Sequence, residues 1–375
     1  MFILFIYDFN YLAREPEKFD KSTQPVKIYM KIAQVAPIIE RIPPKKYGGI
    51  ERVVYALTEG LVRRGHDVTL FASGDSVTAA KLSSVYPQSL RETRVSDLYG
   101  LNVLSLLNIG AAYDRQDEFD IIHEHNGYTA LPTAQIARKP VIMTMHGPFT
   151  PEVARVFKML NKPFLVTISR AQAENVPGIN LLGTIYHGLD MENYPFSGEH
   201  EGYLLFVGRI SLEKGTHLAI QTAIYLNLPL VIAAKLEETD MSYFKQYVGP
   251  HLSERIRWVG EVEEEERNRL MSKALCFLHP VTWREPFGLT LIEAMACGCP
   301  VVAMNHGSIP EIVRDNETGF VVSSLLGMIE AVKNIEKIDR ARCREYALKN
   351  FNTDKMTRAY EDLYLKAIQA ASDKG

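Results

Sequence analysis

Short apolar runs alternate with longer segments of helical period from Lys31 to the end of the chain. Such runs, bounded by turn-forming residues, are typical of buried strands. In the first half they predict strands at Ile32–Val35, Asp67–Ala72, Asp120–His123, Pro140–Met145, Phe164–Ile168 and Thr184–Tyr186. In the second half they predict strands at Tyr203–Val207, Leu230–Ala233, Ile256–Val259, Ala274–Leu278, Pro300–Ala303 and Gly319–Val322. Strands that alternate with helices in this way indicate parallel βαβ units, so we expect an α/β fold.

The alternation occurs twice, with a joint at Asp190–Gly202 that is polar, contains Pro195 and lacks periodicity. We therefore predict two doubly wound, Rossmann-like domains, residues 30–190 and 191–352, facing each other across a cleft. Within the first domain, Gly49–Arg64 carries its apolar residues on one face of a helix that Gly65 should end. Ligands of such sheets bind at the carboxyl ends of the strands, so the cleft is the expected site.

The first residues interrupt this pattern. Met1–Tyr7 is apolar, but seven residues are too few to span a bilayer, which needs about 20 in a helix. No basic segment precedes this stretch and no small-residue cleavage site follows it, which argues against a signal peptide. We interpret residues 1–29 as an extension outside the core with no catalytic role, and Met30 as a plausible alternative start.

Composition narrows the class of protein. The chain has 375 residues, 46% of them hydrophobic, which suffices for two cores. Its formal net charge of −3 argues against a dedicated nucleic-acid binder, which needs a basic surface. The four cysteines form no C-x-x-C pair and are too sparse for a disulfide framework, which favours a cytoplasmic location.

Polar residues follow two predicted strands of the first domain. Glu124-His125-Asn126-Gly127 follows one strand and His146-Gly147-Pro148 follows another, which brings three histidines near one sheet edge when His123 is included. Three histidines and a water can hold a catalytic zinc, but an H-x-H pair more often braces a loop, and no D-x-D occurs in the chain. We predict no metal site and assign His146 to the substrate.

The second domain carries cations where a phosphate would need them. Arg209 ends a predicted strand and Lys214 precedes the next helix, so both could neutralise a departing diphosphate without Mg²⁺. Taken alone, the pair could equally be solvated turn residues.

A short buried helix over Leu289–Cys297 strengthens the phosphate interpretation. Its first turn, with Gly288, Leu289 and Thr290, has no acidic side chain, so its free N–H groups can bind phosphate. Glu293 lies one turn further in, within reach of a ribose diol. A glutamate inside an apolar helix is costly unless it is paired or bound to a ligand.

Glu285 and Glu293, eight positions apart around Pro-Phe-Gly, resemble the E-x7-E motif of family 4 glycosyltransferases with the GT-B fold. Gly48-Gly49-Ile50-Glu51 resembles that family's N-terminal glycine-rich loop, and Arg64–Val68 its first join between helix and strand. The resemblance covers nearly all of the chain from Met30 onward. It implies retaining, metal-independent transfer of a hexose-type sugar from a nucleotide diphosphate sugar to an acceptor.

The resemblance also implies residue roles. Arg209 and Lys214 would bind the pyrophosphate, Glu293 the ribose, and Glu285 the transferred sugar, which His146 would face. Backbone contacts would come from Gly48, Gly49, Gly288, Leu289, Thr290 and, in the base-binding turn, Val262. The final helix, within residues 353–375, would cross back to the first domain. His187 departs from the family's usual asparagine, which puts hinge or acceptor contacts in doubt and leaves the donor site untouched.

The resemblance favours a UDP-sugar over a GDP-sugar and implies no resident cofactor. The acceptor, whether a small molecule, a lipid or a glycan, is not specified, and membrane association would be peripheral at most. The alternatives are a sugar-nucleotide epimerase or hydrolase on the same fold, and a non-catalytic nucleotide-binding protein. An oxidoreductase is disfavoured because no G-x-G-x-x-G follows the first strand.

Overall fold

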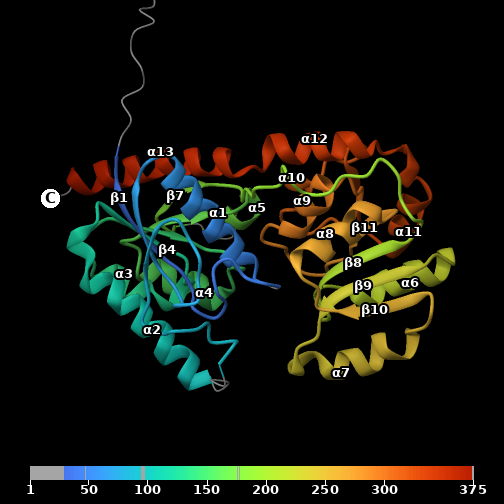
Figure 1. The fold of residues 1–375 in the computed structure, drawn as a ribbon, viewed down its shortest axis with the longest axis horizontal. Helices are drawn as coiled ribbons and strands as arrows, with labels where there is room; N and C mark the ends of the chain where they lie inside the picture. Colours follow the sequence, from blue (N-terminus) through green and yellow to red (C-terminus); the bar gives the residue numbers. More distant parts are fainter. Residues whose placement is uncertain (1–28, 47, 94–97, 175, 177, 374–375) are drawn as a thin grey trace, which may run out of the picture.

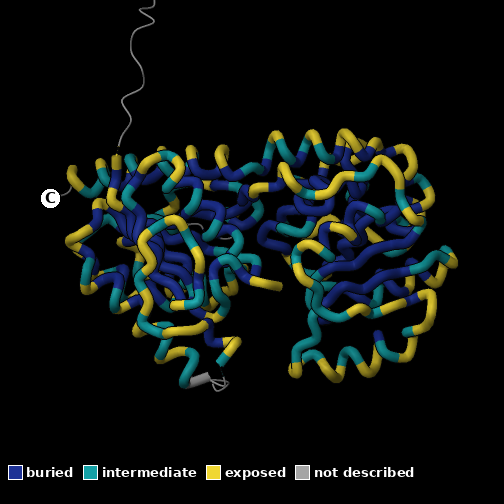
Figure 2. Tube along the Cα trace, viewed as in Figure 1, coloured by how far each residue is buried: buried dark blue, intermediate teal, exposed yellow. Residues whose placement is uncertain are grey.

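The computed structural model describes residues 29–373 except for 47, 94–97, 175 and 177. The interpretation of residues 1–29 as an extension therefore falls, apart from Tyr29, outside the described residues. Two parallel β-sheets, each covered by helices, form two units (Figure 1). The strands are the most deeply buried parts of both units (Figure 2).

The first sheet has seven parallel strands in the order β3-β2-β1-β4-β5-β6-β7. Their bounds are β1 Lys31–Val35, β2 Asp67–Phe71, β3 Lys81–Ser83, β4 Ile121–Glu124, β5 Val141–Thr144, β6 Phe164–Thr167 and β7 Leu181–Thr184. The predicted last strand of this half was wrong in position, because the strand ends at Thr184 instead of beginning there. The edge strand β3 was not predicted.

The second sheet has six parallel strands in the order β10-β9-β8-β11-β12-β13. Their bounds are β8 Leu204–Arg209, β9 Leu230–Lys235, β10 Ile256–Gly260, β11 Cys276–His279, β12 Val301–Met304 and β13 Gly319–Val322. Each sheet winds outward in both directions from its first strand, so the predicted pair of doubly wound Rossmann-like units is confirmed.

The helices follow the strands on both faces of each sheet. Their bounds are α1 Gly49–Arg63, α2 Leu98–Asp114, α3 Leu131–Gln135, α4 Pro151–Met159, α5 Arg170–Ala173, α6 Thr216–Leu226, α7 Met241–Tyr243, α8 Glu264–Lys273, α9 Leu289–Ala296, α10 Ile309–Ile312, α11 Leu325–Lys333, α12 Arg340–Asn350 and α13 Thr353–Ser372. Helix α1 buries the predicted apolar face, and Gly65 follows it with a φ of 90°, as the sequence predicted.

The last helix, α13, runs along the first unit although it follows the second in sequence (Figure 1). It packs on α1, β5 and β7. Gly60 of α1 makes this possible, because a Cβ at that position would lie 2.2 Å from Oγ1 of Thr357. The fully buried Tyr360 and Tyr364 carry α13 into the core of the first unit.

Strand order reverses beside β1 and β4 in the first sheet and beside β8 and β11 in the second. Ligands of open α/β sheets bind at the carboxyl ends of the strands at such reversal points. Gln34 lies near the end of β1, His125 follows β4, Arg209 ends β8 and His279 ends β11. The fold therefore positions these four side chains for the site.

Candidate active site

The N-termini of α1 and α9, one from each unit, approach each other. A Cβ at Gly49 would lie 3.3 Å from Cδ1 of Leu289, so the glycine-rich loop contacts the first turn of α9. Gly288 precedes that turn with a φ of 87°, a conformation that favours glycine, and the first turn, including Thr290, carries no acidic side chain. Two helix N-termini thus meet at the junction of the units; the first turn of α9 has no acid, whereas that of α1 contains Glu51.

Glu285 lies in the loop that leads to α9 and is buried among polar partners. Its Oε2 accepts hydrogen bonds from Nζ of Lys214 at 2.7 Å and from Nε1 of Trp283 at 3.0 Å. Nε2 of His279, at the end of β11, lies 3.6 Å from the same oxygen. The Lys214 ammonium also lies 4.8 Å from the centre of the Trp283 ring. The structure therefore joins Lys214 and Glu285, which the sequence assigned to different parts of one ligand.

The ionised form of Glu285 is favoured despite its burial. Burial alone would raise the pKa of this carboxyl, but the Lys214 charge and His279 outweigh it and lower the pKa to about 2. A fixed anion and a fixed cation therefore lie side by side at neutral pH.

Two tight backbone contacts hold this cluster in place, and sequence reasoning missed both. Gly307 has a φ of 65°, and a Cβ there would lie 2.3 Å from the carbonyl oxygen of Glu285. Gly215, which caps α6, has a φ of 72°, and a Cβ there would lie 2.0 Å from the carbonyl oxygen of Pro280. The loops that carry Lys214 and Glu285 can pack this closely only because glycine occupies both positions.

Glu293 is paired, as its position inside an apolar helix required. Its Oε1 accepts hydrogen bonds from Nη1 of Arg52 at 2.6 Å and from Nη2 of Arg267 at 2.9 Å. Arg52 belongs to α1 of the first unit and Arg267 to α8 of the second. The carboxylate, 1% exposed, thus forms a link between the units. Neither arginine was identified from the sequence. Both bonds are made to Oε1 of Glu293.

Arg209 contacts two acidic side chains of the second unit. Its guanidinium pairs with Glu213, and its Nε lies 3.3 Å from Oδ2 of Asp240 in the segment after β9. Lys214 lies just beyond Glu213, before the Gly215 cap of α6, so the predicted pair of cations is separated by an acid. Val262, in the predicted base-binding turn after β10, is half-buried against the core of the second unit.

Four histidines form a contiguous row from the core of the first sheet outward. The rings of His123 and His125 lie 4.0 Å apart, Nδ1 of His125 lies 2.9 Å from Nε2 of His146, and the His146 and His187 rings stack at 5.2 Å. His187 then meets Phe287 of the second unit at 4.8 Å. His146 therefore lies between the buried network and the junction of the units.

The row is uncharged at neutral pH. Burial lowers the pKa of His146 to about 3 and holds the pKa values of His123, His125 and His187 well below the usual range. His125 and His146 bond to each other instead of converging on a common point. Within the described part of the chain, no group of three or more histidine, cysteine or acidic side chains is arranged to hold a metal ion.

A second contact between the units lies beside the first. Glu311, at the start of α10, accepts hydrogen bonds from the backbone N–H of Arg170 at 2.8 Å and of Ala171 at 2.7 Å. It also accepts one from the hydroxyl of Tyr186 at 2.7 Å. A side chain of the second unit therefore caps α5 of the first, which orients the two units.

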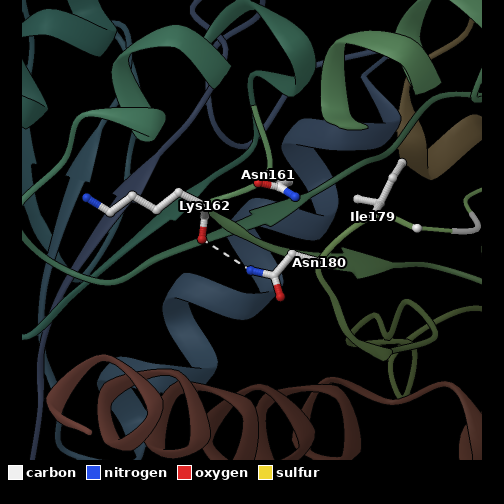
Figure 3. Close-up of a pocket in the computed structure, with 5 residues that line it drawn as sticks. Asn161, Lys162, Ile179 and Asn180 are labelled. Atoms are coloured by element: carbon white, nitrogen blue, oxygen red, sulfur yellow. Dashed lines mark hydrogen bonds between the residues drawn. The ribbon is translucent and has the colours of Figure 1, made fainter. Parts of the chain in front are cut away.

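A hollow of about 520 Å³ in the first unit, lined by Asn161, Lys162, Ile179 and Asn180, lies apart from this site (Figure 3). Lys162 precedes β6 and Asn180 precedes β7, so the hollow is at the amino ends of strands and the candidate site at the carboxyl ends. Among the described residues, no helix has both the length and the apolarity needed to cross a membrane.

Comparison with known proteins gives two family matches that divide the chain in sequence. The family described as glycosyltransferase family 4 matches residues 47–179. The family described as glycosyl transferases group 1 matches residues 192–350. The first match includes the glycine-rich loop and His123, His125 and His146, and the second includes Lys214, Glu285 and Glu293.

Individual relatives agree with these matches. A phosphatidyl-myo-inositol mannosyltransferase from Propionibacterium freudenreichii is 27% identical over 84% of this chain and 86% of its own length. A sucrose-phosphate synthase structure from Thermosynechococcus elongatus has a TM-score of 0.76 at 19% identity, covering 91% of this chain and 99% of that one. Anabaena HepE in complex with UDP-glucose has a TM-score of 0.68 at 20% identity, covering 89% of this chain and 98% of that one.

Proposed function

Because this chain belongs to the family 4 glycosyltransferases with the GT-B fold, we propose that it transfers a hexose-type sugar from a nucleotide diphosphate sugar to an acceptor hydroxyl. We propose UDP as the nucleotide, retention of anomeric configuration, and a mechanism without a metal ion. The observation that carries the proposal is the approach of two helix N-termini, at Gly49 and Leu289, from opposite units.

This arrangement supports diphosphate binding. Backbone N–H groups at a helix N-terminus point at an anion and carry a positive partial charge. Gly48, Gly49 and Gly288 carry no Cβ, so the glycine-rich loop and the first turn of α9 pack closely, and we propose that a diphosphate binds between these two helix ends. Leu289 and Thr290 supply the first N–H groups of α9. Lys214, at the start of α6, adds a fixed cation.

In the proposed reaction the diphosphate leaves with its electron pair as the bond to the anomeric carbon breaks. Lys214, Arg209 and the two helix ends stabilise the charge that develops on it, and such preorganised charges act without rearranging during the reaction. The acceptor oxygen bonds to the anomeric carbon on the face that the diphosphate leaves, and the leaving phosphate oxygen takes the acceptor proton. Glu285, held ionised by Lys214, orients the sugar hydroxyls, and His146 faces the sugar from the first unit.

Glu293 and Val262 complete the proposed donor site. Glu293, whose Oε1 is held by two arginines, binds the ribose diol, and Val262 lies in the turn that contacts the base. The choice of UDP is supported by the bound UDP-glucose in Anabaena HepE. The acceptor is left open, because the relatives transfer to different molecules.

Three incubations test the proposal. The first contains the chain and a panel of UDP-sugars, and the second contains the chain and a panel of candidate acceptors. The third contains the chain, both panels and EDTA. We expect UDP release that requires an acceptor and persists in EDTA. Release from the donor alone would instead indicate a hydrolase. Thermal shift with UDP, GDP and ADP identifies the base, because a ligand that binds the folded state raises its melting temperature. Absence of both binding and transfer across the panels would refute the proposal.

A further inference from the structure

We propose that Gln34 and His125 are positioning residues that fix His146 in one tautomer, with Nδ1 unprotonated, so that it accepts a hydrogen bond from a substrate hydroxyl. The role in catalysis rests on the glycosyltransfer proposed above. The tautomer itself does not, because it is a property of the resting protein. Gln34 and His125 lie where strand order reverses in the first sheet, between β1 and β4, and His146 follows the neighbouring strand β5.

Gln34 sets the direction of the hydrogen bonds. Its side chain is fully buried at the end of β1, and its Nε2 donates to the hydroxyl of Tyr364 at 2.9 Å. Its Oε1 therefore faces Nε2 of His125, at 2.7 Å. An amide oxygen only accepts hydrogen bonds, so Nε2 of His125 must carry the proton. Since His125 is neutral, its Nδ1 is then an unprotonated acceptor.

The unprotonated Nδ1 of His125 in turn fixes the tautomer of His146. Nδ1 of His125 lies 2.9 Å from Nε2 of His146, so Nε2 of His146 must be the donor. A neutral imidazole carries one ring proton, which leaves Nδ1 of His146 unprotonated. That atom is buried and has no hydrogen-bond partner among the described residues. At His146 the row therefore presents a lone pair near the junction of the two units.

The same orientation of the Gln34 amide sets the direction of the hydrogen bonds at the inner end of the row. The Tyr364 hydroxyl accepts from Gln34 and so donates its own hydrogen to Nδ1 of His123, at 2.7 Å. Nε2 of His123 then donates to Oγ1 of Thr144, also at 2.7 Å. In this arrangement the Gln34 amide, the Tyr364 hydroxyl and Nε2 of His123 each have an acceptor, which favours it.

The position of His146 limits what Nδ1 can bind. Its ring stacks between the buried network and His187, which is itself 3% exposed and packed against Phe287. A lone pair fixed there attracts the hydrogen of a hydroxyl group and repels a phosphate oxygen. A sugar hydroxyl is therefore the ligand that this nitrogen selects.

The tautomer can be measured directly in the resting chain. Histidine labelled with ¹⁵N distinguishes protonated from unprotonated ring nitrogens in NMR spectra, and a His146→Gln variant assigns the signals. We expect Nε2 of His146 to be protonated and Nδ1 to be unprotonated without any ligand. A protonated Nδ1, or an equal mixture of the two forms, would overturn the proposal whatever the enzyme transfers.

A kinetic comparison tests the positioning role. Gln34→Met removes the acceptor for His125 and keeps a similar side-chain length, and we expect kcat to fall about 10-fold with the UDP dissociation constant unchanged. The control is Thr167→Val, which removes a buried hydroxyl that bonds to Thr184 at 2.7 Å in the same sheet, and should leave kcat unchanged. Equal effects of both variants would show a merely structural role.

Donor analogues test the hydroxyl contact. Fluorine accepts a hydrogen bond weakly and cannot donate one. Replacing the hydroxyls of the transferred sugar by fluorine one at a time should reveal one position where kcat/KM falls in the natural chain and not in His146→Ala. If every fluorinated donor affected both proteins equally, His146 would not accept a hydroxyl hydrogen. If no nucleotide sugar binds at all, the proposed function fails while the tautomer measurement still stands.

Discussion

Removing the Lys214 cation tests the physical basis of the donor site. The Nζ–Oε2 distance to Glu285 is 2.7 Å, and Glu285 is only 7% exposed. Coulomb's law with an effective dielectric constant of about 20 gives about 6 kcal/mol of gross attraction at that distance. Burial of both groups offsets part of it. The net free energy of the interaction is therefore better derived from the pKa of the Glu285 carboxyl.

The pKa of Glu285 supplies that net value. Burial raises the pKa, but Lys214 and His279 together lower it from 4.5 to about 2, which corresponds to about 3 kcal/mol in favour of the folded state. Because the folded-state pKa is the lower one, this stabilisation is complete above about pH 4.5 and is lost as the pH falls through about 2. In Lys214→Met burial would dominate, so the pKa of Glu285 should rise and about 3 kcal/mol should be lost at pH 7.

The assay is urea unfolding followed by tryptophan fluorescence. Both tryptophans of the chain, Trp258 and Trp283, lie in the second unit, so the signal reports on the unit that contains the pair. The natural chain, Lys214→Met, Glu285→Gln and the double variant give a coupling energy, expected near 3 kcal/mol at pH 7 and smaller at pH 3.

The control cycle uses an exposed pair in the same unit. Lys333 and Glu330 lie 2.6 Å apart on α11, with side chains 45% and 65% exposed. Their coupling should stay below about 0.5 kcal/mol, because solvent screens exposed pairs. A coupling for Lys214 and Glu285 no larger than this control, or one that does not decline below pH 4.5, would refute the reasoning.

Three further predictions follow from the same site. Gly307→Ala should destabilise the second unit by more than about 2 kcal/mol in urea unfolding, because a Cβ would collide with the Glu285 carbonyl. In the control Gly198→Ala, where a Cβ meets nothing within 4 Å, the change in stability should be less than about 0.5 kcal/mol. Glu293→Gln should weaken UDP binding about 10-fold in titration calorimetry, through loss of a charge-assisted hydrogen bond to ribose; an unchanged dissociation constant would contradict the ribose role. Arg209→Lys should weaken binding of UDP but not of uridine, because a planar fork becomes a point charge; equal losses for both would place Arg209 away from the phosphates.

The fold was predictable because most strands are buried on both faces and so form apolar runs. The strand that was missed and the strand that was misplaced lie at the two edges of the first sheet. Lys81–Ser83 is a three-residue strand with no apolar run, so its sequence resembles a loop. Leu181–Thr184 is only partly buried, and the apolar Ile185 and Tyr186 that follow it shifted the prediction toward the carboxyl end.

The candidate site was less predictable, because its partners come from distant segments. The sequence showed that a buried glutamate at Glu293 needs a partner, but Arg52 is 241 residues away and no local pattern connects them. The same holds for Asp240, which lies beside Arg209 in a short 3₁₀ helix after β9. The H-x-H pair was seen, whereas the link through Gln34 to His146 depends on the pairing of β1 with β4.

The placement of α13 determines which unit can complete its folding first during synthesis. Tyr360 and Tyr364 sit in the middle of the first unit, yet ribosomes produce them after the whole of the second. In a nascent chain the second sheet can fold before α13 is available to cover the first sheet. Until then the core of the first unit is incomplete, because Thr144 and His123 lack their tyrosine partners. Truncation before Thr353 would therefore destabilise the first unit, although the deleted residues follow the second unit in sequence.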